Sequence, residues 1–402
     1  MKKKILISSF DMEVGGVERS LISLLENFDY DKYDVDLMLY RHQGDFMTML
    51  PNGHNLLKEI PEYSTFRKSI FEIIKNGHYR IAFSRIIAKY VGRVISSCKR
   101  FEELGLVSMQ LGWKYALPAL PSLKKEYDVA ISYLWPHYFV KEKVNARKKI
   151  AWIHTDYSKL EIDNKIDSKM WEDFDLIVGV SESCVSSFLK KYPQFKERTL
   201  VIENISSTSF IKKMAEESCG ELIDKDNCIN LITVARLSLA KGIDDAVKAC
   251  RKLINQGYNI KWYVVGYGSE EKNLKELINN LNLKDKFILL GKKINPYPYV
   301  KACDIYVQPS RYEGKAVTVT EAQILGKPVV ITNYNTAKSQ VKDGFDGIIT
   351  EMGVDGIVNG VKELINNKEL LESLKYNTSN FNFANNYELE KLYGVIENRY
   401  IS

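Results

Sequence analysis

Short runs of apolar residues alternate with helical stretches along the chain, and this alternation limits the fold more than any other feature. The run Lys4–Ser8 is followed by a turn at Gly15–Gly16 and by Val17–Phe28, whose leucines fall on one helical face. A second apolar run, Tyr33–Tyr40, comes next. A strand, a helix and a further strand in this order form a β–α–β unit with parallel strands, which helices cover on both faces. The sequence therefore predicts an α/β protein.

The same alternation restarts after a polar, acidic stretch at 211–227, which we interpret as an interdomain linker. The 402 residues suffice for two domains of ordinary size. We expect an N-terminal domain over 1–210, a C-terminal domain over 228–384 and a last helix over 385–402. The other predicted strands are Asp128–Ser132, Lys149–Ile153, Leu176–Val180 and Leu200–Ile202, then Asn230–Val234, Lys261–Val265, Phe287–Leu290, Asp304–Gln308, Pro328–Ile331 and Gly347–Ile349.

The composition is that of an ordinary globular protein, with 45% hydrophobic and 27% charged residues. The net charge of +6 suits an anionic ligand or an anionic membrane surface, but does not by itself indicate nucleic acid.

None of the six cysteines forms a C-x-x-C pair, which favours a reduced cytoplasmic location over a disulfide framework. Only three apolar residues separate Lys4 from Ser8, too few for a signal-peptide core, and no run is long enough to span a membrane.

Two glutamates eight positions apart, Glu313 and Glu321, are the strongest functional signal. Glu313 falls in the loop after the predicted strand that ends at Gln308, and Glu321 falls one to two turns into the next helix. The start of that helix offers unpaired N–H groups that suit an anion. A carboxylate can accept hydrogen bonds from the neighbouring hydroxyls of a ribose or a hexose. The alternative is an exposed helix start with two incidental acids.

The segment from Glu313 to Glu321 resembles the E-x7-E signature of glycosyltransferase family 4. The resemblance covers nearly the whole chain and is most specific from Val234 to Gly347. It implies the GT-B fold, in which two Rossmann-like domains face each other across a cleft and the C-terminal helix crosses back to the N-terminal domain. It also implies a retaining transfer of a sugar from a nucleoside diphosphate.

A basic pair, Arg236 and Lys241, follows the first strand of the second domain, where a phosphate site lies in such sheets. The planar fork of Arg236 and the point charge of Lys241 can neutralise a diphosphate and the charge that grows on it during transfer. The resemblance implies this role for both residues, although the family more often has glycine where this chain has Ala235. A solvated basic helix start is the alternative.

In the N-terminal domain, Gly15 and Gly16 let the backbone approach a ligand and leave N–H groups to bind an anion. They do not fit G-x-G-x-x-G, which argues against a dehydrogenase. His154 ends a predicted strand and would point into the cleft. The resemblance implies that His154 contacts the donor sugar and that the glycine turn borders the donor phosphates. A hydrogen-bonded polar residue at a strand end is the alternative for His154.

The remaining candidates lie in loops of the C-terminal domain. Gly266 belongs to a Gly-x-Gly turn, for which a plain strand-to-helix turn is the alternative. The resemblance implies that backbone near Lys293 holds the base, and that Lys315 and Ala316 line the sugar pocket. The predicted catalytic set is His154, Arg236, Lys241 and Glu313; the predicted donor-binding set is Gly15, Gly16, Gly266, Lys293, Gly314, Lys315, Ala316, Val317 and Glu321.

Two D-x-D pairs, Asp34–Asp36 and Asp173–Asp175, resemble the metal motif of other glycosyltransferases. Both stand at the start of apolar strand runs, where acids alternate outward, so we interpret them as structural. The resemblance implies an enzyme that needs no metal, because basic residues and helix N-termini replace Mg²⁺. We therefore expect neither a metal nor a cofactor. No carboxylate is placed as a covalent nucleophile, which favours a front-face route in which the leaving phosphate takes the acceptor's proton.

The resemblance therefore implies a retaining hexosyltransferase that uses a nucleoside diphosphate sugar, with UDP chosen on family frequency alone. The acceptor would be a hydroxyl of a glycan or lipid-linked glycan in bacterial capsule or exopolysaccharide synthesis. A non-catalytic nucleotide-sugar- or polysaccharide-binding protein and a GT-B epimerase remain alternatives. A phosphorylase is disfavoured because no lysine context indicates a pyridoxal cofactor.

The stretch 66–100 carries nine basic residues and one acid, interleaved with isoleucine and phenylalanine. It predicts a long helix or a helix pair, basic and amphipathic, that docks on an anionic membrane, which would make the protein peripheral on the inner face of the cell membrane. A solvated helix face is the alternative. Nucleic acid is not expected as a partner, because no aromatic stacking pattern accompanies the basic residues.

Overall fold

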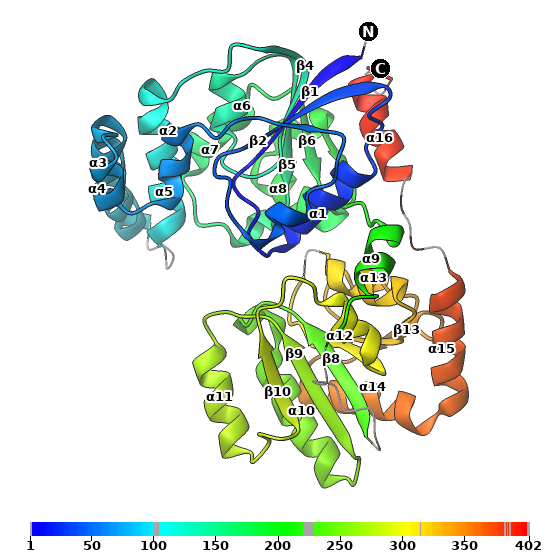
Figure 1. Ribbon diagram of the computed structural model, residues 1–402. Coiled ribbons are helices and arrows are strands. Elements are labelled where there is room, and N and C mark those ends of the chain that lie inside the picture. The colour runs from blue at the N-terminus through cyan, green and yellow to red at the C-terminus, as the bar shows by residue number, and fades with distance from the viewer. Residues whose placement is uncertain are drawn as a thin grey trace. The chain divides into compact units, whose positions relative to one another are not determined.

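The computed structural model describes residues 2–99, 101, 104–219, 228–313, 315–381, 383, 385 and 387–399. The chain divides into two compact units, Met1–Ile205 with Asn386–Ser402, and Ser206–Asn385. Each unit is built around one sheet of parallel strands with helices packed against it (Figure 1). The predicted α/β class with two parallel sheets is confirmed.

The first sheet has the strand order β3-β2-β1-β4-β5-β6-β7. The order reverses at β1, whose Ile5 pairs with Val35 on one side and Val129 on the other. Ligands bind at the carboxyl ends of the strands beside such a reversal. The strands are β1 Lys3–Ser9, β2 Tyr33–Leu39, β3 Asn55–Leu56, β4 Glu126–Ser132, β5 Asn145–Ile153, β6 Leu176–Gly179 and β7 Thr199–Val201.

Helices of the first unit bury one apolar side each. Helix α1 buries Leu21, Leu24 and Leu25, as its spacing predicts. The stretch 66–100 contains two helices, α3 and α4, and α4 packs on α5 through Ala88 and Leu111. The helices are α1 Gly16–Glu26, α2 Pro61–Ser64, α3 Ile70–Lys75, α4 Tyr79–Lys99, α5 Leu104–Ala116, α6 Tyr138–Lys143, α7 Asn164–Trp171, α8 Glu182–Lys191 and α16 Tyr387–Ile396.

The chain returns to the first unit through its last helix, α16, as expected. Tyr393 of α16 stacks on Tyr33 of β2 with ring centroids 5.1 Å apart, and its hydroxyl oxygen accepts a hydrogen bond from the backbone N–H of Asp29 at 2.7 Å. Lys3 of β1 pairs with Glu397 at 2.8 Å just after the helix. Aromatic stacking and a hydrogen bond therefore fix this helix on the edge of β1 and β2.

The second sheet has the order β10-β9-β8-β11-β12-β13 and is covered on both faces. Along β9, Trp262 and Val264 pack with α10, α11 and α14, whereas Tyr263 and Val265 pack with α12 and α13. Successive strand residues point to opposite faces, which explains the continuous apolar run. The strands are β8 Ile229–Val234, β9 Ile260–Val265, β10 Phe287–Gly291, β11 Ile305–Gln308, β12 Val329–Thr332 and β13 Gly347–Thr350. The helices are α9 Thr208–Met214, α10 Ile243–Asn255, α11 Glu271–Asn280, α12 Tyr297–Ala302, α13 Val317–Ile324, α14 Gly353–Asn366 and α15 Lys368–Asn380.

The predicted linker at 211–227 differs from the structure at its start. Residues 211–214 belong to α9, which is part of the second unit, and residues 220–227 lie outside the described residues. Ser207 caps α9 by accepting a hydrogen bond from the backbone N–H of Phe210, and Ile211 is buried against Tyr297 and Ile324. One apolar residue per turn is enough to dock a short helix. The acidic residues that follow α9 made the whole segment resemble a linker. Within the described part of the chain, no helix has the length and apolar character needed to cross a membrane.

Candidate functional site

Two loops at the carboxyl edge of the second sheet bring Lys241 and Glu313 together. The Lys241 Nζ lies 2.6 Å from each carboxylate oxygen of Glu313. Lys241 ends a 3₁₀ turn, Leu239–Lys241, that follows β8, and Glu313 lies in the loop after β11. Strands β8 and β11 are parallel neighbours, so these loops leave the sheet at the same edge. The Glu313 side chain is 6% exposed and that of Lys241 26%, so a ligand can reach the lysine.

A chain of hydrogen bonds holds the Glu313 carboxylate in place. The Ser310 hydroxyl donates to its Oε1 at 2.6 Å, and the Gln308 amide donates to the same oxygen at 3.1 Å. The Tyr306 hydroxyl in turn donates to Gln308 Oε1 at 2.6 Å. All three donors come from β11 or its end, and such a connected network fixes one orientation. Sequence reasoning missed Gln308 and Ser310, although polar residues at the end of a buried strand are a usable signal.

Glu321 is buried on α13, where its side chain keeps a fixed partner. Glu321 is 4% exposed, and the Tyr297 hydroxyl donates to its Oε1 at 2.9 Å. The first turn of α13 begins after Ala316, which provides no side-chain cap. The two glutamates of the motif therefore stand on either side of a helix start whose first N–H groups have no side-chain cap.

Arg236 lies two residues after the end of β8, and its surroundings differ from those of Lys241. It is exposed, and its side chain makes no hydrogen bond or ion pair with the described residues. Its loop is anchored by the backbone, because Ala235 N–H donates to Val265 C=O at 3.0 Å. The guanidinium is thus open to an anionic ligand, whereas Lys241 is already paired with a carboxylate.

Close backbone contacts explain why glycine occupies two positions beside these loops. Gly242 has φ +62°, and a Cβ there would lie 2.0 Å from the carbonyl oxygen of Pro309. At Gly266 a Cβ would lie 1.8 Å from the carbonyl oxygen of Ala235. Neither position accepts a side chain without a backbone shift. Gly266 therefore has a packing role in addition to the donor contact predicted for it.

The other predicted residues of this unit lie in two segments, the loop after β10 and the segment that leads into α13. Lys293 follows β10 and lies over the Tyr299 ring, 5.4 Å from its centroid. Lys315 and Ala316 precede α13, and Val317 is its first residue. The Ala316 N–H donates to the Gln340 side-chain oxygen at 3.2 Å. Gly314 lies outside the described residues.

In the first unit, His154 follows β5 and lies against Tyr133, with ring centroids 4.6 Å apart. Burial lowers the pKa of His154 to about 3, so its ring is neutral near pH 7. Its Nε2 is buried without a partner among the described residues. The hydroxyls of Tyr133 and Ser20 lie 2.6 Å apart, which ties Tyr133 to α1. That helix begins at Gly16, and its N-cap, Gly15, leaves the first N–H groups without a side-chain cap.

The two D-x-D pairs have structural partners. Asp36 is fully buried and accepts hydrogen bonds from Lys125, Tyr127 and Asn55. Asp175 accepts a hydrogen bond from the Lys149 N–H at 2.6 Å. The expectation that these strand acids point outward is wrong for Asp36, because three donors compensate its burial. Across the described ranges, no group of three or more histidine, cysteine and acidic side chains is arranged to hold a metal ion.

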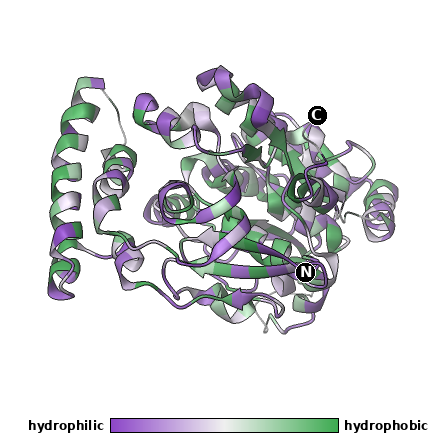
Figure 2. Ribbon diagram, turned by 90° about the horizontal axis from the view of Figure 1, so that it is seen from above, coloured by the Kyte–Doolittle hydropathy of each residue, from purple (hydrophilic) through white to green (hydrophobic). Residues whose placement is uncertain are grey.

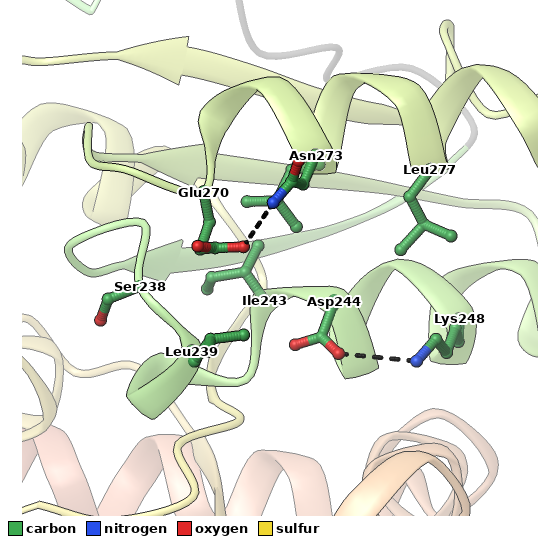
Figure 3. A pocket seen from close by; sticks show the side chains of 9 residues that line it. Ser238, Leu239, Ile243, Asp244, Lys248, Glu270, Asn273 and Leu277 are labelled. Carbon is green, nitrogen blue, oxygen red and sulfur yellow. Dashed lines mark hydrogen bonds and ion pairs between the residues drawn. The ribbon is translucent and has the colours of Figure 1, made fainter. Parts of the chain in front are cut away.

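A pocket of about 270 Å³ opens beside the Arg236–Lys241 loop, between the starts of α10 and α11 (Figure 3). Its lining combines leucines with Asp244 and Glu270, and Lys248 pairs with Asp244. None of the predicted site residues lines it. Two carboxylates disfavour a diphosphate, so we do not assign the donor to this pocket.

Comparison with known proteins finds a family match over most of the second unit. Residues 220–381 match the family model described as "Glycosyl transferases group 1". The chain is 29% identical over 254 residues to an uncharacterized glycosyltransferase of Methanocaldococcus jannaschii, covering 60% of each chain. It is 27% identical over 215 residues to the capsular polysaccharide biosynthesis glycosyltransferase CapM of Staphylococcus aureus, covering 50% of this chain and 55% of CapM. The chain spans less than two thirds of the length of three of its curated relatives, which it covers over 42%, 60% and 65%.

Solved structures resemble the whole chain. Anabaena HepE, solved with UDP and glucose, has a TM-score of 0.67 at 17% identity and covers 98% of this chain and 99% of its own. S. aureus TarM, solved with UDP among its ligands, has a TM-score of 0.66 at 15% identity, with the same coverage. These likenesses show the fold, and the predicted GT-B class is confirmed.

Proposed function

We propose that this chain is a glycosyltransferase that moves a hexose from a nucleoside diphosphate sugar, UDP-linked, to a hydroxyl of a glycan or lipid-linked glycan. The observation that carries the proposal is the Lys241–Glu313 pair at the carboxyl edge of the second sheet, inside the segment that matches group 1 glycosyl transferases. The similarity to CapM supports a role in bacterial surface polysaccharide synthesis. The UDP in the HepE and TarM structures supports the nucleotide.

In the proposed reaction the bond between the sugar C1 and the diphosphate oxygen breaks, and C1 joins the acceptor oxygen with retention. The leaving phosphate takes the proton of the acceptor hydroxyl. Arg236 and Lys241 stabilise the charge that grows on the diphosphate. When the diphosphate binds, the Lys241 ammonium contacts the diphosphate as well as Glu313, and the Glu313 carboxylate also accepts a hydrogen bond from a sugar hydroxyl. No step of this route uses a metal ion.

Nucleotide binding provides the direct test. UDP at about 100 times its Kd stabilises the folded chain by about 2.7 kcal/mol, because it binds only the native state. We therefore expect UDP to raise the Tm by several degrees and more than GDP or ADP does, and Arg236→Ala to reduce the shift. A response to none of the three would contradict the donor site, and a larger response to GDP or ADP would contradict the choice of base.

Donor hydrolysis separates the proposed enzyme from its alternatives. In the absence of an acceptor, a retaining transferase slowly hydrolyses its bound donor and releases UDP, whereas a binding protein leaves the donor intact. An epimerase would interconvert the sugar instead. Chromatographic separation of the UDP-sugars and of the released UDP after incubation with the chain distinguishes the three outcomes.

We also propose that α3 and α4 dock on an anionic membrane, which would place the protein at the cytoplasmic face. Along α4, exposed large apolar residues recur every three or four positions, and exposed cations lie among them. Hydrophobic and hydrophilic segments alternate along this helix (Figure 2, upright helix at the left). Phe71 is 76% exposed, Phe83 65% and Tyr90 72%. The other exposed apolar residues are Ile74, Tyr79, Ile86, Ile87 and Val94, and the exposed cations are Arg67, Lys75, Arg80, Lys89, Arg93 and Lys99. The opposite side of α4 packs on α5. An apolar stripe with flanking cations fits the boundary of an anionic bilayer.

Vesicle binding tests this membrane proposal. We expect co-sedimentation with phosphatidylglycerol vesicles at low salt, weaker binding at high salt, and little binding to phosphatidylcholine. Replacing Phe83 and Tyr90 with serine should weaken binding at least tenfold, because two buried aromatic anchors are lost. Tyr376→Ser is the matched control, since Tyr376 is 69% exposed in the second unit. Equal losses in both variants, or no salt-sensitive binding of the wild type, would leave α4 as a solvated face.

A further inference from the structure

Arg311 connects the loop that carries Glu313 to the loop that carries Lys241. One of its guanidinium nitrogens donates to the Leu239 carbonyl at 2.7 Å and to Asp244 Oδ1 at 2.8 Å. The other donates to Asp244 Oδ2 at 2.9 Å and to Asp245 Oδ2 at 2.6 Å. The Arg311 backbone N–H also donates to the Ala240 carbonyl at 2.8 Å. All five bonds run from the loop after β11 to the 3₁₀ turn after β8 or to the first turn of α10.

These contacts surround the segment whose position decides where Lys241 lies. Along the chain, Lys241 lies between Leu239 and Ala240, whose carbonyls accept these bonds, and the two acids of α10, Asp244 and Asp245. Gly242, which follows Lys241, takes the left-handed conformation. Arg311 therefore holds the chain on both sides of Lys241. Two forked bonds to Asp244 need the planar guanidinium, which a lysine cannot supply. Lys248 also approaches Asp244 and Asp245, but only at 3.5 and 3.8 Å from an exposed position.

The charges in this cluster are strongly coupled. Hydrogen bonding to Asp244 is the main cause that raises the pKa of Arg311. The pKa of Asp244 is lowered, because hydrogen bonding and the charge of Arg311 outweigh its burial. Asp244 and Asp245 also stand in the first turn of α10, where the helix dipole favours negative charge. Arg311 and Asp244 are therefore both charged near pH 7.

We propose that Arg311 is a positioning residue for sugar transfer, which acts by holding Lys241 at the distance from Glu313 that the reaction needs. Arg311 acts through Lys241 and not by contact with the donor. This inference rests on the proposed function for its kinetic consequence, but the clamp itself is a property of the loops. A displacement of a charged group by about 1 Å lowers turnover by up to 10²-fold, so the expected signature is a loss in kcat with little change in nucleotide affinity.

The kinetic test compares Arg311→Gln with Arg311→Lys and with a matched control. Arg311→Gln should lower kcat at least tenfold while the Kd for UDP changes less than threefold. Arg311→Lys restores the charge but not the fork, so it should recover only part of kcat. Lys275→Gln is the control, because it removes an exposed ion pair of α11 in the same unit, Lys275–Glu271. A kcat of Arg311→Gln within twofold of the wild type, or full rescue by lysine, would overturn the proposal.

Hydrogen exchange tests the clamp without activity. The backbone amides of 238–243 should exchange at least tenfold faster in Arg311→Gln than in Lys275→Gln, because local opening no longer breaks the Arg311 contacts. Unchanged exchange would overturn the clamp even if the variant is inactive. If the wild type neither transfers sugar nor binds UDP while exchange still rises, the proposed function fails and the clamp stands.

Discussion

Replacing Lys241 with alanine is expected to lower kcat about 100-fold or more, while the Kd for UDP rises less. A preorganised charge that meets developing negative charge contributes about 2.7–4 kcal/mol to the transition state. Lys241 has the features of such a group, because Glu313 holds its ammonium through two contacts of 2.6 Å and Arg311 fixes the chain around it. Steady-state kinetics with a saturating UDP-sugar measure the change. Arg236→Ala should also lower kcat on the order of 100-fold.

The control for Lys241→Ala must separate lost chemistry from lost stability. Removing Lys241 leaves the nearly buried Glu313 carboxylate without its ion pair, which lowers the free energy of unfolding. The double variant Lys241→Ala with Glu313→Gln removes that unpaired charge and should recover the Tm but not kcat. Lys275→Ala controls for the loss of an exposed lysine in the same unit. If all variants at 236 and 241 keep near-wild-type kinetics, the site assignment is wrong.

Much of the fold follows from the sequence, because parallel strands buried on both faces leave continuous apolar runs. Predicted Asn230–Val234 is β8, Ile229–Val234, and predicted Lys261–Val265 is β9, Ile260–Val265. The short strand β3, Asn55–Leu56, has no such run and was not predicted. Helix α9 was missed because its acidic neighbourhood reads as a linker, although Ile211 is buried.

In the candidate site, the sequence indicates which charged residues and glycines to consider, but not the hydrogen bonds that surround them. Lys241 and Glu313 were predicted to share a site, and their side chains meet. Gln308, Ser310 and Arg311 were not predicted, because their roles depend on which loop lies opposite, and a single sequence does not contain that pairing. Asp36 shows the reverse case, in which a motif-like acid is a buried group satisfied by Lys125 and Tyr127.

Replacing Glu321 with alanine is expected to raise the Kd for UDP about 10- to 100-fold and to leave kcat at saturating donor nearly unchanged. Hydrogen bonds to a charged group contribute about 1.5–3 kcal/mol, and we assign the ribose hydroxyls as the donors. The Tyr297 hydroxyl holds the carboxylate at 2.9 Å, so the acid is oriented before the nucleotide binds. Isothermal titration calorimetry with UDP measures the loss. Glu321→Gln keeps the shape and the Tyr297 contact, and should lose less affinity than alanine.

The nucleotide 2′-deoxy-UDP decides whether the ribose is what Glu321 recognises. If the carboxylate accepts a hydrogen bond from the 2′-hydroxyl, wild type should bind 2′-deoxy-UDP about tenfold or more weakly than UDP, whereas Glu321→Ala should bind both almost equally. The two changes then remove the same interaction, and their free energies do not add. Additive losses would place Glu321 away from the 2′-hydroxyl and would leave it as a buried partner of Tyr297.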